Sequence, residues 1–489
     1  MRISETHIFL STDTNASLQM RLREAISTEI WSGRFVAGDH LPSTRALAKH
    51  LGIARITVAI AYDDLAADGY LTASPRSGYF VSTEAPTSLK RTDPVFIGEA
   101  KPIDWTIRLL KHFKGVGAQA KPNDWRTYKY PFIFGQADQS LFPHDAWRAC
   151  ARRALGRRDF NIIAGDFGTE DDQMLVEQIV KRSLPDRHIA AKPEEVLMTL
   201  GAQNSLWVVT QMIFAGRSVR RAVVEDPGYP ELREILQFAG VEIIPVPVDE
   251  NGLCIDQIPD DVQAVFVTPS HQAPTGATMS TERRLALIAM AQDRDFIIVE
   301  DDYDFEICFS GPPRAALKSY DLSGRVIYLG SFSKSLFPGL RLGYIVAPAF
   351  FISEARGLRT LIARHPPGIT QRITAYFLSL GHYNAHARLL RKTFDARHKV
   401  LIKTLCEYGV VLPGLEQSGA SVWIAGPDGV DTSMIALELR AQGVLIEPGA
   451  PFFASEHPPK NFIRLSYSTI DSTLIPDGVR LVMQALYKQ

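Results

Sequence analysis

The chain has 489 residues, of which 46% are hydrophobic and 22% charged, which is typical of a folded protein of about three domains and excludes a disordered or collagen-like chain. Lys and Arg number 53 against 54 Asp and Glu, so the net charge of −1 indicates that any nucleic-acid site is local. The four cysteines include no CxxC pair, so neither a zinc cluster nor a disulfide framework is indicated.

The start of the chain, Met1 to His7, lacks the apolar core and the small-residue cleavage site of a secretory signal. Apolar runs such as Ala286–Ala291 are far shorter than the roughly 20 residues that a membrane helix needs. We therefore expect a cytoplasmic protein without a membrane span, and we predict no metal site.

Residues 15–83 have the pattern of a small α+β domain, with three helices followed by a hairpin. Apolar residues recur at helical spacing from Leu18 to Ile30. Gly33 follows them as a stop signal, so the first helix is expected to end just before it.

The second and third helices are expected to be joined by a short turn. Ser43 is a suitable amino-terminal cap for a helix over 44–50, and Gly52 makes the turn into the next helix. Two β-type segments, 70–72 and 79–81, flank a polar loop. The whole pattern predicts a winged helix-turn-helix.

Basic side chains gather around the two helices that flank the turn. A helix-turn-helix places its second helix in the major groove, where side chains near its amino end contact base edges and neighbouring groups hold phosphates. Five residues occupy suitable positions: Arg45, Lys49, Arg55, Thr57 and Arg76, the last at the tip of the wing. This arrangement indicates a site for double-stranded DNA; the alternative is a winged helix that only docks another protein.

The segment Leu41–Val58, together with Gly69-Tyr-Leu, resembles the GntR-type winged helix-turn-helix. The resemblance implies that five residues approach DNA: Ser43, Arg45, Arg55, Thr57 and the wing residue Gly78. In that family a Ser that can bind phosphate usually stands at the position of Ala54. One contact to the DNA backbone is therefore expected to be weaker here.

Residues 84–129 lose this regular pattern because four prolines interrupt them: Pro86, Pro94, Pro102 and Pro122. Only a short stretch from Trp105 has helical character. So long a stretch without regular structure is unusual inside one compact domain. We therefore predict a linker here and a second domain over 130–489.

Apolar β-type runs alternate with helical segments after residue 130. Seven strands are expected, at 196–200, 222–225, 241–248, 264–268, 296–300, 326–330 and 342–347. Runs such as Ala264-Val-Phe-Val are continuous, as expected of strands buried on both faces of a mostly parallel sheet in an α/β domain. A small α+β subdomain over about 350–489 is expected from a helix over 385–408 and strands near 421–424, 444–447 and 461–467.

Lys334 lies among apolar residues directly after a predicted buried strand. A lysine in such a place can form a Schiff base with an aldehyde cofactor, especially where desolvation lowers its pKa. Ser331, Ser333 and Arg341 supply hydroxyl and guanidinium donors, and the guanidinium fork suits a phosphate.

Other strand ends carry polar side chains too, and ligands of open α/β sheets gather at such ends. Asp301 and Tyr303 follow the strand at 296–300. They supply the carboxylate and the hydroxyl that pyridoxal phosphate (PLP) needs beside its ring nitrogen and its phenolic oxygen. The amides of Ala202 and Gln203 open a helix and suit the phosphate, and Tyr229 offers a ring for stacking. An Asp-Asp-Tyr sequence at a strand end is by itself more often a solvated turn, but these signals together predict a PLP site.

Taken in order, these segments resemble the fold-type I, class I/II aminotransferases from about residue 130 to the carboxyl end. The resemblance implies that Lys334 forms the Schiff base and that Asp301 and Tyr303 contact the cofactor ring. The segment Asn461-Phe-Ile-Arg-Leu-Ser-Tyr matches the motif whose Arg holds a substrate carboxylate, which implies that Arg464 binds an effector. The alternative for Arg464 is a surface salt bridge.

The order of a GntR-type DNA-binding domain (the reader domain), a linker and an aminotransferase-like domain resembles the MocR subfamily of GntR regulators over nearly the whole chain. The resemblance implies a PLP-dependent transcriptional regulator that acts as a head-to-tail homodimer on repeated half-sites. A small amino compound, or PLP itself, would change DNA binding through the Lys334 aldimine. The alternatives are an active aminotransferase with an accessory DNA-binding domain and a regulator whose large domain has lost the cofactor.

Two positions depart from the relatives. Ala273 stands where aminotransferases usually have an Asn that bonds the cofactor oxygen, so the electronic tuning of the cofactor is expected to differ from that in a working transaminase. Glu231 stands two residues after Tyr229, where the γ-aminobutyrate-responsive branch carries a carboxylate-binding Arg. We therefore do not expect γ-aminobutyrate as the effector.

Overall fold

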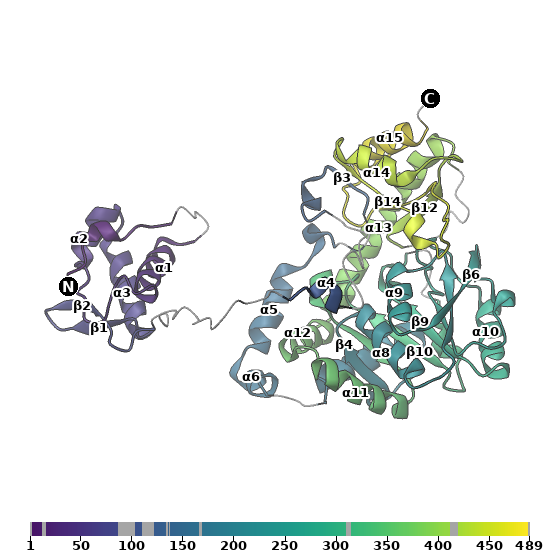
Figure 1. Cartoon of the computed structure of the whole chain (residues 1–489), viewed down its shortest axis with the longest axis horizontal. Coiled ribbons are helices and arrows are strands. Elements are labelled where there is room, and N and C mark those ends of the chain that lie inside the picture. Colours follow the sequence, from purple (N-terminus) through teal and green to yellow (C-terminus); the bar gives the residue numbers. More distant parts are fainter. Residues whose placement is uncertain are drawn as a thin grey trace. The chain divides into compact units, whose positions relative to one another are not determined.

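The structure, a computed structural model, describes residues 2–11, 16–86, 103–109, 122–133, 135, 137–165, 169–309, 314–410 and 419–487. Contacts divide the chain into two units, Met1–Lys111 and His112–Gln489, which are drawn in Figure 1 and described separately below. Residues 87–102 and 110–121, the greater part of the predicted linker, lie outside the described residues.

The first unit is a winged helix-turn-helix, as the sequence predicts. It contains α1 (Leu18–Trp31), α2 (Thr44–Leu51), α3 (Arg55–Ala67) and the antiparallel strands β1 (Leu71–Ser74) and β2 (Gly78–Val81), with a short α4 (Trp105–Arg108) beyond them. The Ser43 hydroxyl caps α2 by accepting a hydrogen bond from the amide of Ala46, and Gly52, at a φ of 66°, ends that helix. The left-handed backbone at Gly52 produces the turn between α2 and α3.

The residues before α1 pack onto this unit, which the sequence analysis did not anticipate. A 3₁₀ turn, η1, spans Glu5–His7, and Ile3 and Ile8 on either side of it are buried. The amide of Ile3 donates a hydrogen bond to the carbonyl oxygen of His40 at 2.8 Å, and His40 in turn bridges to Phe80 on β2. The first residues of the chain therefore support the wing.

The second unit is built on an eight-stranded sheet with the order β4-β11-β10-β9-β8-β5-β6-β7. The strands are β4 (Val196–Thr199), β5 (Arg221–Asp226), β6 (Glu242–Asp249), β7 (Gly252–Leu253), β8 (Ala264–Val267), β9 (Ile297–Asp302), β10 (Val326–Ser331) and β11 (Gly343–Val346). Strands β6, β5, β8, β9 and β10 run parallel, whereas β11 pairs antiparallel with β10 and β4. The expectation of a mostly parallel sheet is confirmed.

Helices cover both faces of this sheet. The helices of this unit up to residue 379 are α5 (His144–Ala154), α6 (Arg157–Ile163), α7 (Gln173–Gln178), α8 (Ala202–Phe214), α9 (Pro230–Phe238), α10 (Thr281–Asp293), α11 (Ala349–Ala363) and α12 (Gly368–Ser379). Neighbouring residues of β5 belong to different core clusters: Ala222 packs with residues of α8 and α11, and Val223 packs with residues of α10. Burial on both faces explains the continuous apolar runs in the sequence.

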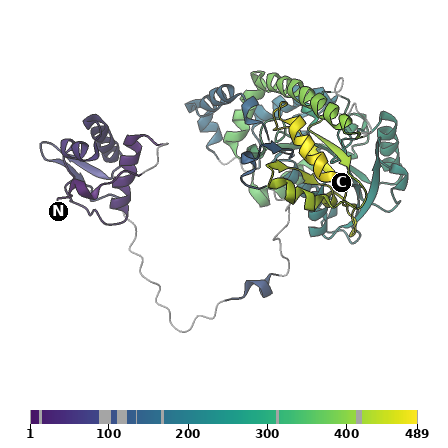
Figure 2. The ribbon, with the colours of Figure 1, turned by 90° about the horizontal axis from the view of Figure 1, so that it is seen from above.

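The carboxyl-terminal part forms a smaller layer of helices against a three-stranded sheet, β12-β15-β14. Its elements are α13 (His382–Glu407), β12 (Ser421–Ala425), α14 (Thr432–Arg440), β13 (Val444–Leu445), β14 (Glu447–Pro448), β15 (Phe462–Ser466) and α15 (Ile475–Leu486). The long helix α13 contacts α15, which lies near the carboxyl end in Figure 2.

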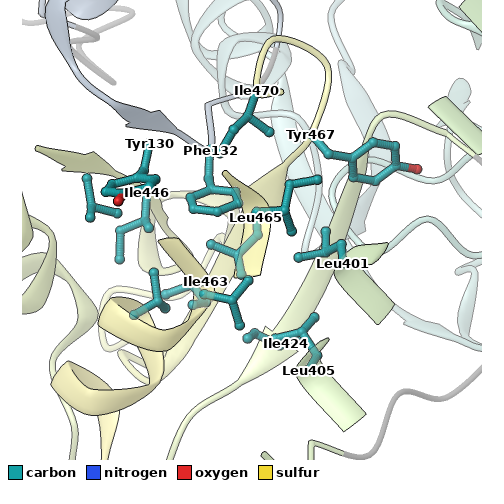
Figure 3. Packing of buried hydrophobic residues seen from close by; sticks show 14 of the residues in the cluster. Tyr130, Phe132, Leu401, Leu405, Ile424, Ile446, Ile463, Leu465, Tyr467 and Ile470 are labelled. Carbon is teal, nitrogen blue, oxygen red and sulfur yellow. The ribbon is translucent and has the colours of Figure 1, made fainter. Parts of the chain in front are cut away.

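The start of the second unit joins this smaller layer. Strand β3 (Tyr130–Pro131) pairs in parallel with β13, and Phe132 packs beside Leu465 of β15 and Leu401 of α13 in one buried cluster (Figure 3). Among the described residues, no helix is both long and apolar enough to cross a membrane.

Short helical turns connect these elements. They are the 3₁₀ turns η2 (Trp125–Thr127), η3 (Gln139–Leu141), η5 (Pro185–Arg187), η6 (Pro193–Glu195), η7 (Ile255–Gln257), η8 (Phe305–Ile307), η9 (Leu317–Tyr320), η10 (Pro338–Leu340) and η11 (Ala450–Phe452), and the π-helical turn η4 (Ile179–Ser183).

Candidate functional site

Residues from the carboxyl ends of several strands line one cavity of about 360 Å³ in the second unit. Its lining includes every residue that the sequence nominated for cofactor or effector binding: Ala202, Gln203, Tyr229, Asp301, Tyr303, Ser331, Ser333, Lys334, Arg341 and Arg464. These positions are far apart in the sequence. The large sheet brings most of them together because its parallel strands end at one edge, whereas Arg464 comes from β15 of the smaller sheet.

Asp301 lies near the end of β9 and faces this cavity. Its Oδ1 atom is buried and has no hydrogen-bond partner among the described residues. Burial, together with the nearby carboxylates of Asp302, Asp304 and Glu225, raises the pKa of Asp301 to about 7. A protonated ring nitrogen placed against Oδ1 would satisfy this acceptor and favour the ionised carboxylate.

Hydroxyl, amide and guanidinium groups meet at the amino end of α8. Gly201, at a φ of 95°, precedes the helix and leaves the amides of Ala202 and Gln203 at its first turn. A side chain at Gly201 would lie 3.6 Å from the Arg341 guanidinium and 3.7 Å from the Ser333 hydroxyl, so both groups flank this turn. Ser333 Oγ is buried without a hydrogen-bond partner among the described residues. The donor set suits a phosphate.

The hydroxyl of Tyr303 donates a hydrogen bond to the carbonyl oxygen of His271 at 3.0 Å. The His271 ring lies against Gly419, and its Nδ1 atom is 2.7 Å from a carboxylate oxygen of Asp304. His271 therefore links the loop after β8 to the loop that carries Tyr303. The sequence analysis left His271 unassigned.

Arg464 has a partner that the sequence did not reveal. Its Nε atom lies 2.9 Å from Oε2 of Glu447, and its guanidinium lies over the ring of Phe452 at 4.6 Å. Strands β14 and β15 place Glu447 and Arg464 directly opposite each other. Only 7% of Arg464 is exposed, so the ion pair is buried in the cavity wall and is not the surface salt bridge considered above.

Other lining residues escaped the sequence analysis, among them Thr268, Glu447 and Phe452. Thr268 directly follows β8, and that position at a strand end was the available signal. Its hydroxyl accepts a hydrogen bond from the amide of Ala273 at 3.2 Å. Ala273 and Glu231, the two departures from the relatives, also line the cavity.

The nominated DNA-contacting residues lie on the surface of the first unit. Ser43, Arg45, Lys49, Arg55, Arg76 and Gly78 are exposed, and Thr57 is partly exposed. The Nε atom of Arg55 donates a hydrogen bond to Oγ1 of Thr44 at 3.3 Å, which brings the amino ends of α2 and α3 together. Arg76, at a φ of 65°, occupies the turn between β1 and β2.

Comparison with known proteins assigns a family to each unit. The gntR family of bacterial regulatory proteins matches residues 18–81, and the class I and II aminotransferases match residues 137–480.

Two similar proteins match nearly from end to end. The HTH-type transcriptional regulator TauR of Rhodobacter capsulatus is 48% identical, over 99% of this chain and 100% of its own. The probable rhizopine catabolism regulatory protein MocR of Rhizobium meliloti is 30% identical, over 98% of this chain and 95% of its own.

A similar solved structure is that of LysN, an α-aminoadipate aminotransferase from Thermus thermophilus in complex with N-(5'-phosphopyridoxyl)-L-leucine. It has a TM-score of 0.70 and 26% sequence identity, and the match covers 79% of this chain and 99% of LysN. The part of this chain that matches LysN is therefore similar to an aminotransferase in fold as well as in sequence.

Proposed function

Because the chain belongs to the GntR-family transcriptional regulators of MocR-like architecture, with a class I and II aminotransferase domain, we propose that this DNA-binding regulator uses the aminotransferase-like cavity as a sensor. The cavity would hold PLP and respond to a small amine by changing the affinity of the protein for DNA. One observation carries the proposal: Lys334, Asp301 and Arg341 line a single cavity in a chain that also has a winged helix-turn-helix.

The residues present fit PLP. The partnerless Oδ1 of Asp301 suits the ring nitrogen, and the partnerless hydroxyl of Ser333 suits the phosphate. When bound, PLP supplies an aldehyde with which an amine can condense. The groups that would hold it are Lys334 at the aldehyde, Tyr303 near the phenolic oxygen, Tyr229 against the ring, and Ser331, Ser333, Arg341 and the amides of Ala202 and Gln203 around the phosphate.

Two features favour sensing over turnover. Ala273 presents a methyl group to the cavity, and a methyl group cannot bond the cofactor oxygen. The Arg464 guanidinium already faces Glu447, so a substrate carboxylate would compete with that side chain. An active aminotransferase remains the alternative function, and sustained conversion of an amino acid and a keto acid by the purified protein would support it.

We also propose that the regulator acts as a head-to-tail homodimer that presents two reader domains to repeated half-sites. Large apolar side chains on α11, Phe350 and Leu361, are 80% and 86% exposed, which supports a face covered in an assembly. Sedimentation equilibrium of the full-length protein is expected to give twice the chain mass, and a monomer at micromolar concentration would contradict this part of the proposal.

The sensing proposal is tested with the full-length protein and a DNA duplex selected by that protein from a random pool. PLP is added, a panel of primary amines is screened for changes in the visible spectrum, and the active amines are then tested for their effect on DNA affinity. We expect at least one amine to change both properties in the wild type and neither property in Lys334→Ala. Equal responses of the two proteins would overturn the sensing role.

A further inference from the structure

The outward face of α3 carries large apolar side chains. Ile56 is 66% exposed and Ile60 is 41% exposed, and residues four apart lie on the same side of a helix. The opposite side of α3 is fully used in packing, since Val58, Ala61, Tyr62 and Leu65 are buried in the core of this unit. Neither isoleucine is needed for that core.

The groups around Ile56 and Ile60 are polar or charged, and those near Ile56 are cationic. Arg55 precedes Ile56 and bonds to Thr44 at the start of α2, the helix that presents the exposed side chains of Arg45 and Lys49. One turn beyond Ile60, the carboxylate of Asp63 accepts a hydrogen bond from the hydroxyl of Tyr79 on β2. An apolar strip with cations at its Ile56 end, the amino end of α3, matches a polyanion with apolar groups between its charges better than it matches a protein surface.

The major groove of DNA offers one such apolar group, the C5-methyl of thymine. We propose that Ile56 reads thymine methyl groups, and that Ile60 extends the same contact by one helical turn. This inference rests on the proposed function, because it requires the amino end of α3 to enter the major groove. The proposal assigns sequence specificity to Ile56, whose side chain makes no hydrogen bond. The neighbouring Arg55 is suited to hydrogen-bond a guanine.

The test replaces thymine by uracil, which removes only the methyl group. Full-length protein selects a duplex from a random pool, each thymine is then replaced singly by deoxyuridine, and affinities are measured by fluorescence anisotropy. For the wild type we expect about 3- to 10-fold weaker binding at one or two positions in each half-site. In Ile56→Ala this sensitivity should disappear at those positions, and in Ile56→Val it should persist in part.

Two controls separate the possible failures. Met20→Ala removes an exposed apolar side chain of α1 and should keep the wild-type uracil profile. Arg55→Ala reports whether α3 faces DNA at all. If Arg55→Ala weakens binding but the uracil profiles of wild type and Ile56→Ala coincide, the thymine contact is wrong while the DNA-binding role of α3 stands. If neither variant alters binding to the selected duplex, the placement of α3 in the groove is wrong as well.

Discussion

Asp301 and Asp302 are adjacent residues with opposite environments, because successive side chains of a strand point to opposite faces. Asp302 bonds to Arg187 at 2.7 Å and to the Tyr328 hydroxyl at 2.8 Å, and it fixes the end of β9. Asp301 faces the cavity with an acceptor atom that has no partner in the described structure. Of these two adjacent carboxylates, Asp302 therefore stabilises the fold, whereas Asp301 can accept a hydrogen bond from a cationic group in the cavity.

The raised pKa of Asp301 predicts a cost to stability when the cofactor is removed. A carboxyl group whose pKa is higher in the folded state, here about 7, stabilises the fold at acidic pH, and that contribution is lost as pH rises through 7. At pH 8, Asp301→Asn should therefore be more stable than the wild type by about 1–3 kcal/mol, with PLP binding greatly weakened. Thermal unfolding from pH 5 to 8 measures this; a difference between the two proteins that does not change with pH would contradict it.

Arg55 is expected to contribute to DNA recognition through its exposed guanidinium. Arg55→Ala should weaken binding to a selected duplex by about 1–3 kcal/mol if the side chain makes a bidentate base contact. Arg34→Ala is a matched control, because Arg34 is also exposed. It follows α1 and forms an ion pair with Glu29 of that helix. Equal affinities of the Arg55 and Arg34 variants for the selected duplex would remove Arg55 from the interface.

At the residue scale, the sequence could nominate side chains that lie in recognisable segments. Lys334 and Asp301 belong to such segments, and both line the cavity. Glu447 could not be found in this way, because its role depends on a register between β14 and β15 that brings it opposite Arg464. A contact made by two short strands leaves no pattern in the sequence around either residue.

At the scale of elements, buried arginines tie together the loops that carry the cavity. Arg187, in η5, donates hydrogen bonds to Asp302 on β9, to the hydroxyl of Ser270 after β8 and to the carbonyl oxygen of Arg314. Only 2% of Arg187 is exposed. One side chain therefore holds together the end of β9, the loop after β8 and the segment at Arg314.

Removing this guanidinium should leave a buried, uncompensated carboxylate. We expect Arg187→Met to lower the free energy of unfolding by about 3–5 kcal/mol and to weaken PLP binding, although Arg187 does not line the cavity. Pairing it with Asp302→Leu should restore much of the stability, because the lone charge is then absent. Chemical denaturation of the single and double variants tests this, and a single variant as stable as the wild type would refute it.

The elements themselves were largely predictable. Apolar β-type runs identified the seven main strands of the large sheet. In strands such as β8 and β10 the runs are continuous, because burial on both faces removes polar residues from them. Two features could not be predicted: β11 inserts antiparallel between β10 and β4, and residues 2–8 pack against His40 and the wing. Pairing partners and short irregular segments depend on contacts that are distant in sequence, and periodicity does not record them.

For the whole molecule, the proposed function couples two events that occur on different units of the chain, amine binding and DNA binding. Such coupling requires the amine to bind two arrangements of the protein with different free energies. We expect a sensed amine to change DNA affinity about 5- to 150-fold, which is the usual range of such coupling. Lys334→Ala should keep its basal DNA affinity and lose this response, as titrations with and without amine would reveal.

The order of the units could be predicted from the sequence, because each has its own pattern of apolar residues and its own motifs. The identity of the amine could not, since Glu231, Glu447, Phe452 and Arg464 come from separate elements and only the fold places them on one cavity. The net charge of −1 alone did not indicate the basic residues around α2 and α3, which were found from their positions in the sequence.

The most direct test of the central claim is borohydride reduction of the full-length protein with PLP, followed by peptide mass mapping. The account predicts a visible absorption band that disappears on reduction, with a phosphopyridoxyl group on the peptide that contains Lys334. Lys334→Ala should give no such adduct while it remains folded. A colourless protein that cannot be reconstituted, or an adduct on another lysine, would contradict the assignment of this cavity as the PLP-dependent sensor.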